Sequence, residues 1–122
     1  MPLHDDHLRQ AEHNLQFSET LSGADYPDWV ATGLFYAALH YIDAFLATRG
    51  QHPGSHDIRD GFVARVQELR PLYNDYRFLK NSSRTARYYC PPVPFTGGYL
   101  RSLRDTHLEQ IRVGLRPFIP IP

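Results

Sequence analysis

Residues 26–50, YPDWVATGLFYAALHYIDAFLATRG, decide the fold, because apolar and small side chains occur on every side of the helix that they predict. A helix that is apolar all round belongs in the middle of a protein. Asp25 is placed to cap its start, Pro27 suits the first turn, and Gly50 stands where a left-handed residue ends many helices. About 22 residues can therefore form one rod of about 33 Å, around which other helices pack.

Helical periodicity continues on both sides of this rod. The predicted helices cover residues 4–22, 57–70, 71–89 and a last stretch whose inward side chains run from Leu100 to Leu115. Pro71 should bend or break the chain between the middle two, and the proline-rich segment 90–98 should be a loop. No run of alternating β-branched residues predicts a strand. We therefore expect an all-α fold, an antiparallel up-and-down bundle of four to five helices with residues 29–47 buried most deeply.

The length of 122 residues, with 42% hydrophobic side chains, fits one globular domain over residues 1–122. Its last segment, RPFIPIP at residues 116–122, cannot continue a helix because it contains three prolines. We expect an extended tail whose Phe118, Ile119 and Ile121 need an apolar groove. The sequence leaves open whether that groove belongs to the same chain or to a partner.

Charge and cysteine content narrow the class of protein. A formal net charge of zero argues against a chain that simply coats nucleic acid or anionic lipid, so such a function would need a local patch. The single cysteine, Cys90, excludes an internal disulfide and fits a reducing cytoplasm. The start, MPLHDDHLRQ, has no apolar secretory core, and His40 and Asp43 interrupt the rod. We expect a cytoplasmic protein that does not enter a membrane.

The sequence contains no recognised metal or cofactor motif. His4, His7 and His13 lie near Asp5 and Asp6, but their spacing matches no closed metal site. The chain also has no Gly-rich phosphate loop, no His-Glu-x-x-His and no paired-cysteine motif. The sequence therefore predicts no metal and no cofactor.

The central rod carries one partly polar stripe. Its members share the three-and-four spacing of one helix face and are Trp29, Tyr36, His40, Asp43 and Ala47. His40 and Asp43 lie one turn apart, and buried polar groups of this kind hydrogen bond to each other or to neighbouring helices. In a second interpretation the pair borders a catalytic cleft, where Asp43 holds the imidazole in one tautomer so that it can bind or move a proton. Both interpretations remain open at this stage.

A cationic edge on the helix predicted over residues 71–89 is the most informative polar feature. On an ideal helical wheel, an aromatic and four cations fall within a stripe about 80° wide. These residues are Tyr73, Arg77, Lys80, Arg84 and Arg87. The stripe is either a solvated face paired to acids elsewhere or a binding surface for phosphate. In the second case guanidinium groups grip phosphate oxygens, and a tyrosine such as Tyr73 or Tyr88 stacks on an unpaired base.

Three segments resemble the HEPN superfamily of small helical bundles, in the same order and over about residues 5–115. Phe35 to Tyr41, FYAALHY, continuing to Gly50, looks like the aromatic-Tyr-Ala-Ala second helix of that family. Ser55-His56 looks like the Ser-His entry to its third helix. Residues 84–88, RTARY, resemble the Arg-x-x-Ala-Asp-Tyr ending of one branch, with Arg87 in place of the acid.

The resemblance implies a dimeric, RNA-associated module, often a ribonuclease of toxin–antitoxin or antiviral systems encoded beside a nucleotidyltransferase. The signature of active members is an arginine and a histidine separated by four to six residues. After Arg84 those positions hold Tyr89, Cys90 and Pro91, so the motif histidine is missing. Arg101 and His107 give a second match by spacing.

Two functions follow from this comparison. The first is an RNA-binding module or a metal-independent endoribonuclease centred on Arg84, with His40 and Asp43 as supporting polar groups. The Arg101 and His107 pair is the alternative catalytic site. The second function is a non-enzymatic protein that forms a homodimer or docks a neighbour such as a nucleotidyltransferase. Whether the chain cleaves RNA is left open, because cleavage needs a base for the 2′-hydroxyl, an acid for the leaving oxygen and a cation for the phosphorane charge.

Overall fold

The computed structural model describes residues 3–122, and within that range all regular secondary structure is helical, with no strand. The elements are α1 (His4–Thr20), α2 (Pro27–Thr48), α3 (His56–Arg65), the 3₁₀ turn η1 (Arg70–Leu72), α4 (Tyr73–Tyr88), α5 (Gly97–Ser102), the π-helical stretch η2 (Leu103–Leu108) and α6 (Glu109–Leu115). The last three follow one another without a break and form one rod. The all-α prediction is confirmed.

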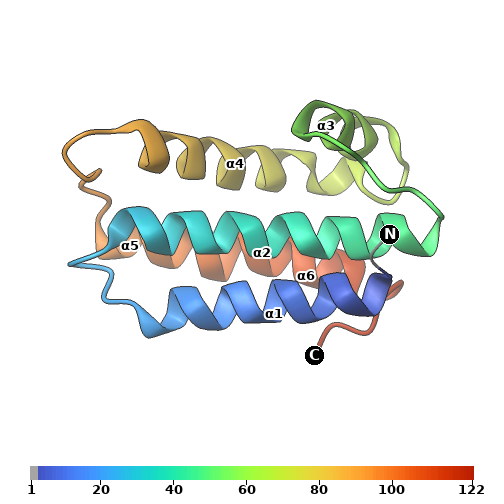
Figure 1. Ribbon diagram of the computed structural model, residues 1–122, viewed down its shortest axis with the longest axis horizontal. Helices are drawn as coiled ribbons and strands as arrows, with labels where there is room; N and C mark the ends of the chain where they lie inside the picture. The colour runs from blue at the N-terminus through green and yellow to red at the C-terminus, as the bar shows by residue number, and fades with distance from the viewer. Residues whose placement is uncertain (1–2) are drawn as a thin grey trace.

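The helices form an antiparallel bundle around α2 (Figure 1). In that view α4 lies on one side of α2, α1 lies on the other, and the rod made of α5 and α6 lies behind it. α2 packs against each of these helices, whereas the short α3 lies over one end of α4. The chain direction alternates along the sequence of long helices, which confirms the predicted up-and-down topology.

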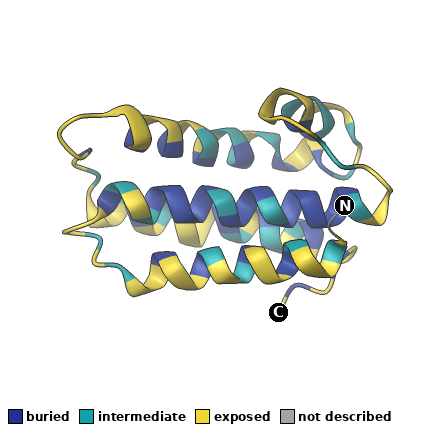
Figure 2. Ribbon diagram, viewed as in Figure 1, coloured by how far each residue is buried: buried dark blue, intermediate teal, exposed yellow. Residues whose placement is uncertain are grey.

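The middle of α2 is the centre of the core. From Ala31 to Leu46 every residue is buried except Tyr36 and His40, which are half-buried (Figure 2). Trp29 is 52% exposed, so the predicted buried segment 29–47 is slightly too long. α2 is long and apolar enough to cross a membrane by length and composition alone, but 83% of that stretch is buried under the rest of the protein. That burial is the pattern of a core helix.

Two helix ends differ from the prediction. Asp25 does not cap α2, because Tyr26 occupies the cap position and makes no side-chain cap bond. The C-terminal end is as predicted, since Gly50 has a φ of 71°. α3 ends at Arg65 rather than near residue 70, because Val66 adopts an extended conformation with ψ of 128°. The turn that follows carries Leu69 into the core ahead of the predicted break at Pro71.

The C-terminal tail packs on its own chain. Ile119 and Ile121 are buried, and Phe118 lies edge-on against Phe45 at 5.6 Å between ring centroids. The prediction of an extended tail from residue 116 is wrong for the first three residues, which form a turn held by Leu115. The apolar groove therefore belongs to the same chain, and the tail gives no argument for a partner.

Candidate functional site

A pocket between α3 and α4 gathers most of the cations of the predicted stripe. It has a volume of about 680 Å³ and is lined by His56, Lys80, Arg84, Thr85, Arg87 and Tyr88. α4 provides all of these residues except His56, which is the first residue of α3. The Ser55 hydroxyl accepts a hydrogen bond from the Ile58 backbone N–H at 3.2 Å, so this cap fixes where α3 begins and brings the imidazole to the pocket.

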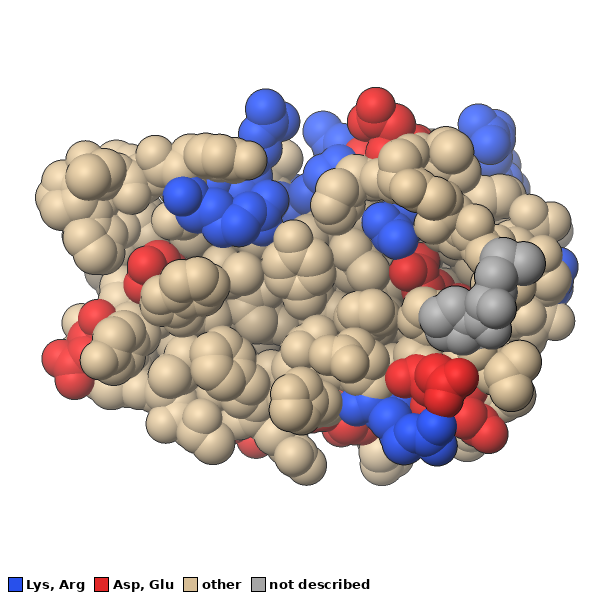
Figure 3. Space-filling model, viewed as in Figure 1, with Lys and Arg blue, Asp and Glu red and all other residues tan. Residues whose placement is uncertain are grey.

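The stripe divides into a paired half and an unpaired half. Asp60 of α3 forms ion pairs with both Arg77, at 3.3 Å, and Lys80. Arg84 and Arg87, in contrast, have no carboxylate partner among residues 3–122. Figure 3 shows the Lys and Arg side chains gathered over α4 on this face. The interpretation of the stripe as a face paired to acids is thus correct for Arg77 and Lys80. The positive charge without a carboxylate partner among the described residues belongs to Arg84 and Arg87.

Arg87 is held in place although it has no carboxylate. Its guanidinium donates a hydrogen bond to the Ser83 hydroxyl. The same group lies over the ring of Tyr36 at 5.8 Å and over that of Tyr88 at 6.0 Å. Contacts of this kind orient a guanidinium while leaving N–H donors for an anion.

Exposed aromatic rings lie next to these cations. A second pocket, of about 320 Å³, shares Arg87 with the first and is lined also by Trp29, Tyr89 and the Cys90 loop. Trp29 is 52% exposed, Tyr88 79% and Tyr89 50%. Helical spacing puts Trp29 on the partly polar stripe of α2 but gives no link to α4, since only the packing of α2 against α4 brings the two together.

His56 is a candidate site residue that sequence reasoning passed over. His56 is exposed overall, but partial desolvation against the pocket lowers the pKa of its imidazole. The nearby charges of Arg59, Lys80 and Arg87 lower it further, and the opposing effect of Asp60 does not reverse the shift. The ring is therefore neutral at pH 7 and can accept a proton. Ser55-His56 was noted only for its resemblance to a family segment, and no local spacing links His56 to Arg84. The pocket supplies the imidazole that the sequence lacks after Arg84.

Asp43 is bound to a neighbouring helix and not to His40. Arg59 of α3 donates from Nε to Oδ1 at 2.7 Å and from Nη2 to Oδ2 at 2.9 Å, and the two side chains are only 9% and 8% exposed. Although burial alone lowers the pKa of Arg59, its hydrogen bonds to Asp43 outweigh that effect and raise the pKa. Of the two interpretations of the polar stripe, the structure supports the buried bond to another helix.

His40 makes its closest polar contact with α1. Its Nδ1 lies 3.1 Å from Nδ1 of His7, and burial lowers the pKa of both rings. His40 also lines a third pocket, which is bordered by Ser55, His56 and Arg59. Neither His40 nor Asp43 lines the pocket of Arg84, so the predicted group of Arg84, His40 and Asp43 does not meet in one pocket. His56 lines both pockets.

The alternative pair is not brought together. Nδ1 of His107 lies 2.9 Å from Oδ1 of Asp75, and its ring stacks on Phe78 at 4.3 Å. Arg101 lines a pocket shared with α1 and the start of α2 instead. His107 is also only half-buried, and Leu108 takes the inward position, because a π-helical stretch adds a residue to the turn.

Tyr73 lies apart from the pocket as well. It is half-buried against the core, and the Arg77 guanidinium lies 6.0 Å from its ring centroid. Both residues belong to the region where α4 begins, close to the ion pair with Asp60. The predicted binding residues therefore separate into a structural pair, Tyr73 and Arg77, and a pocket group that begins at Lys80.

These features define a class: a small all-helical protein that presents a cationic pocket flanked by aromatic rings. The HEPN domain family matches residues 4–101, well over half of the chain, and the chain belongs to that family. The matched range contains every residue of the α3–α4 pocket. At the level of the family, membership supports an RNA-associated, ribonuclease-type or defence module. No curated protein and no solved structure matches this chain.

Proposed function

We propose that this HEPN protein binds RNA and that the α3–α4 pocket holds the RNA backbone. One observation carries the proposal: Arg84 and Arg87, which lack an ion-pair partner among residues 3–122, line one pocket with Lys80 and His56. Guanidinium groups match phosphate oxygens in a bidentate geometry, and an anion there would compensate charge that the fold leaves unbalanced.

The exposed rings of Trp29, Tyr88 and Tyr89 extend this surface beyond the phosphate site. Each unpaired base has a flat face, and stacking one on an aromatic side chain contributes about 1–3 kcal/mol. A strand whose phosphate occupies the pocket can place its neighbouring bases on these rings, since Arg87 and Tyr88 belong to the same turn of α4. This arrangement favours single-stranded RNA or loops over a duplex, whose bases are stacked on each other.

The same pocket supports cleavage, with His56 in place of the missing motif histidine. The neutral imidazole takes the proton of a 2′-hydroxyl, and the 2′-oxygen attacks the adjacent phosphorus. The bond from phosphorus to the 5′-oxygen then breaks, and the leaving oxygen takes a proton from solvent. Arg84 stabilises the negative charge that builds on the phosphorane oxygens. The products are a 2′,3′-cyclic phosphate and a 5′-hydroxyl, and no metal ion takes part.

RNA binding is tested by titrating the full chain into fluorescently labelled single-stranded RNA at several salt concentrations. Each phosphate contact contributes about 0.7 to the slope of log affinity against log salt for single strands. Arg84→Ala should weaken binding and flatten this slope by about that amount. The matched control is Arg104→Ala, which removes a cation that is paired with Glu19 at 2.7 Å and should leave binding unchanged. Equal behaviour of the two variants would contradict the pocket.

Cleavage is tested with a structured RNA such as tRNA, scored for both retardation and cut products. His56→Gln should abolish cutting and leave binding within a few-fold of the unchanged chain. If the chain binds RNA without cutting it, the catalytic assignment of His56 is wrong and the protein is an RNA-binding module alone. If no RNA binds, the interaction protein becomes the better description, with the ring of Trp29 as the docking surface to test against a nucleotidyltransferase-type partner.

A further inference from the structure

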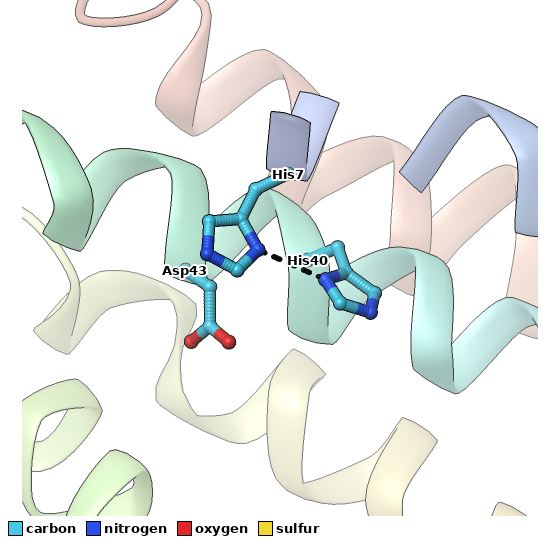
Figure 4. Close-up of side chains that lie close together, drawn as sticks. All are labelled: His7, His40 and Asp43. Carbon is cyan, nitrogen blue, oxygen red and sulfur yellow. Dashed lines mark hydrogen bonds between the residues drawn. The ribbon is translucent and has the colours of Figure 1, made fainter. Parts of the chain in front are cut away.

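Three ligand-type side chains meet between α1 and α2, away from the proposed RNA pocket (Figure 4). His7 comes from α1, and His40 and Asp43 come from successive turns of α2. One ligand atom from each lies within 4.8 Å of the others, and the carboxylate is buried while both rings are half-buried. His7 could not be separated from the other histidines of α1 by sequence alone, because no local spacing connects it with residues on α2.

We propose that His7, His40 and Asp43 bind one divalent cation of the zinc class. Zinc bonds to histidine nitrogen at about 2.0–2.1 Å, so two nitrogens on one tetrahedral ion lie about 3.3 Å apart. Nδ1 of His7 and Nδ1 of His40 are already 3.1 Å apart. The side-chain torsion that turns an imidazole is soft, so both lone pairs can be directed at one ion without moving the helices.

Asp43 can coordinate the ion and keep both of its hydrogen bonds from Arg59. A carboxylate has about four lone-pair positions, and the two hydrogen bonds from Arg59 occupy one on each oxygen. An outer partner of this kind orients a metal ligand and keeps it ionised. Arg59 also brings a positive charge close to the ion, so we expect weaker binding than in a closed four-ligand structural site.

We expect a water molecule to complete the coordination, because one of the three ligands borders a pocket. His40 borders a pocket of about 310 Å³ that is also lined by Ser55, His56 and Arg59. Two imidazoles and one carboxylate with an open position, which a water can fill, make up a common catalytic zinc geometry.

The test is calorimetric titration of the full chain with Zn²⁺ after treatment with a chelator. We expect one ion per chain, and His7→Ala and His40→Ala should each lower the affinity at least tenfold. His13→Ala is the matched control, since it removes an exposed histidine from the same helix and should change nothing. His7→Gln repeats the test in case truncation of the half-buried ring disturbs α1. Circular dichroism of each metal-free variant establishes that its helices are intact.

A second measurement uses Co²⁺, whose visible absorption is intense only when the ion is tetrahedral. The unchanged chain should develop this absorption, and His7→Ala should not. Absence of one-to-one Zn²⁺ binding would overturn the proposal, as would undiminished binding in both His7 variants or an equal loss in His13→Ala. These readouts measure metal alone, so the result is independent of whether the chain binds RNA.

Discussion

Asp43→Asn should cost far more stability than any substitution of an exposed acid in this protein. The substitution removes the charge opposite Arg59 and leaves at most one good acceptor where two now lie at 2.7 and 2.9 Å. The Arg59 side chain is only 9% exposed, so water cannot replace Asp43 as the hydrogen-bond acceptor of its guanidinium. The nearest carboxylate on its own helix, Asp60, is already shared by Arg77 and Lys80. Arg59 would therefore remain buried and uncompensated.

Breaking a buried pair in this way costs about 3–5 kcal/mol, a large part of the roughly 5–15 kcal/mol that stabilises a typical domain. The assay is urea denaturation followed by circular dichroism, with a chelator present so that metal plays no part. The control is Glu19→Gln, which breaks a pair at 2.7 Å whose side chains are 52% and 40% exposed, and which should cost less than about 1 kcal/mol.

A double variant separates two contributions to the lost stability: the missing ion pair between Asp43 and Arg59, and the cost of leaving the Arg59 charge buried without a partner. Replacing a buried ion pair by apolar residues of similar size is often neutral. Asp43→Leu combined with Arg59→Met should therefore recover most of the stability that Asp43→Asn loses. A loss below about 1 kcal/mol in Asp43→Asn would refute the reasoning, because it would mean that Arg59 finds water or another acceptor when its partner is neutral.

Three further predictions concern hydroxyls, protons and assembly. Tyr41→Phe should cost about 1.5–3 kcal/mol in urea denaturation, because the Tyr41 hydroxyl donates to a carboxylate of α1 at 2.6 Å. Tyr76→Phe should cost less, since the buried Tyr76 hydroxyl lies near Arg59 but makes no well-formed hydrogen bond among residues 3–122. Partial desolvation and the surrounding cations lower the pKa of His56 in the folded protein, so the unfolded chain binds a proton more tightly. The free energy of unfolding should therefore be highest above about pH 6.5, the ordinary pKa of histidine, and should fall as the pH drops below it. His56→Gln should reduce that fall. Light scattering should give twice the chain mass of 14.1 kDa if the homodimer implied by the family resemblance forms, and a mass of one chain at micromolar concentration would exclude it.

The sequence was sufficient for the fold because the signals for it are local. The all-round apolar pattern of α2 identified the core helix, and Gly50 marked its end through a conformation that glycine adopts easily. The early end of α3 was missed because Val66 is an ordinary helix residue by type. Its extended conformation accompanies the burial of Leu69, and that burial depends on packing between helices rather than on local sequence.

The candidate site was harder to predict because its residues meet only in space. Arg84 was singled out from helical spacing on one element, and such spacing is visible in a sequence. His56 joins it from another helix, and Trp29 joins the adjacent surface from a third, so neither has a fixed distance along the chain from Arg84. The partner of Asp43 was missed for the same reason, since Arg59 approaches from α3.

Arg59 and Asp60 are adjacent residues of opposite charge that attach α3 to two different helices. Arg59 forms an ion pair with Asp43 of α2, and Asp60 forms ion pairs with Arg77 and Lys80 of α4. Val63 is the only apolar residue that α3 itself buries, so these charges replace much of the usual apolar anchoring. We expect α3 to detach locally while the four-helix core stays closed, and its amide hydrogens to exchange with deuterium well before those of α2. Because His56 is the first residue of α3, each detachment of α3 would move the imidazole away from Arg84, and each return of α3 to the bundle would bring it back.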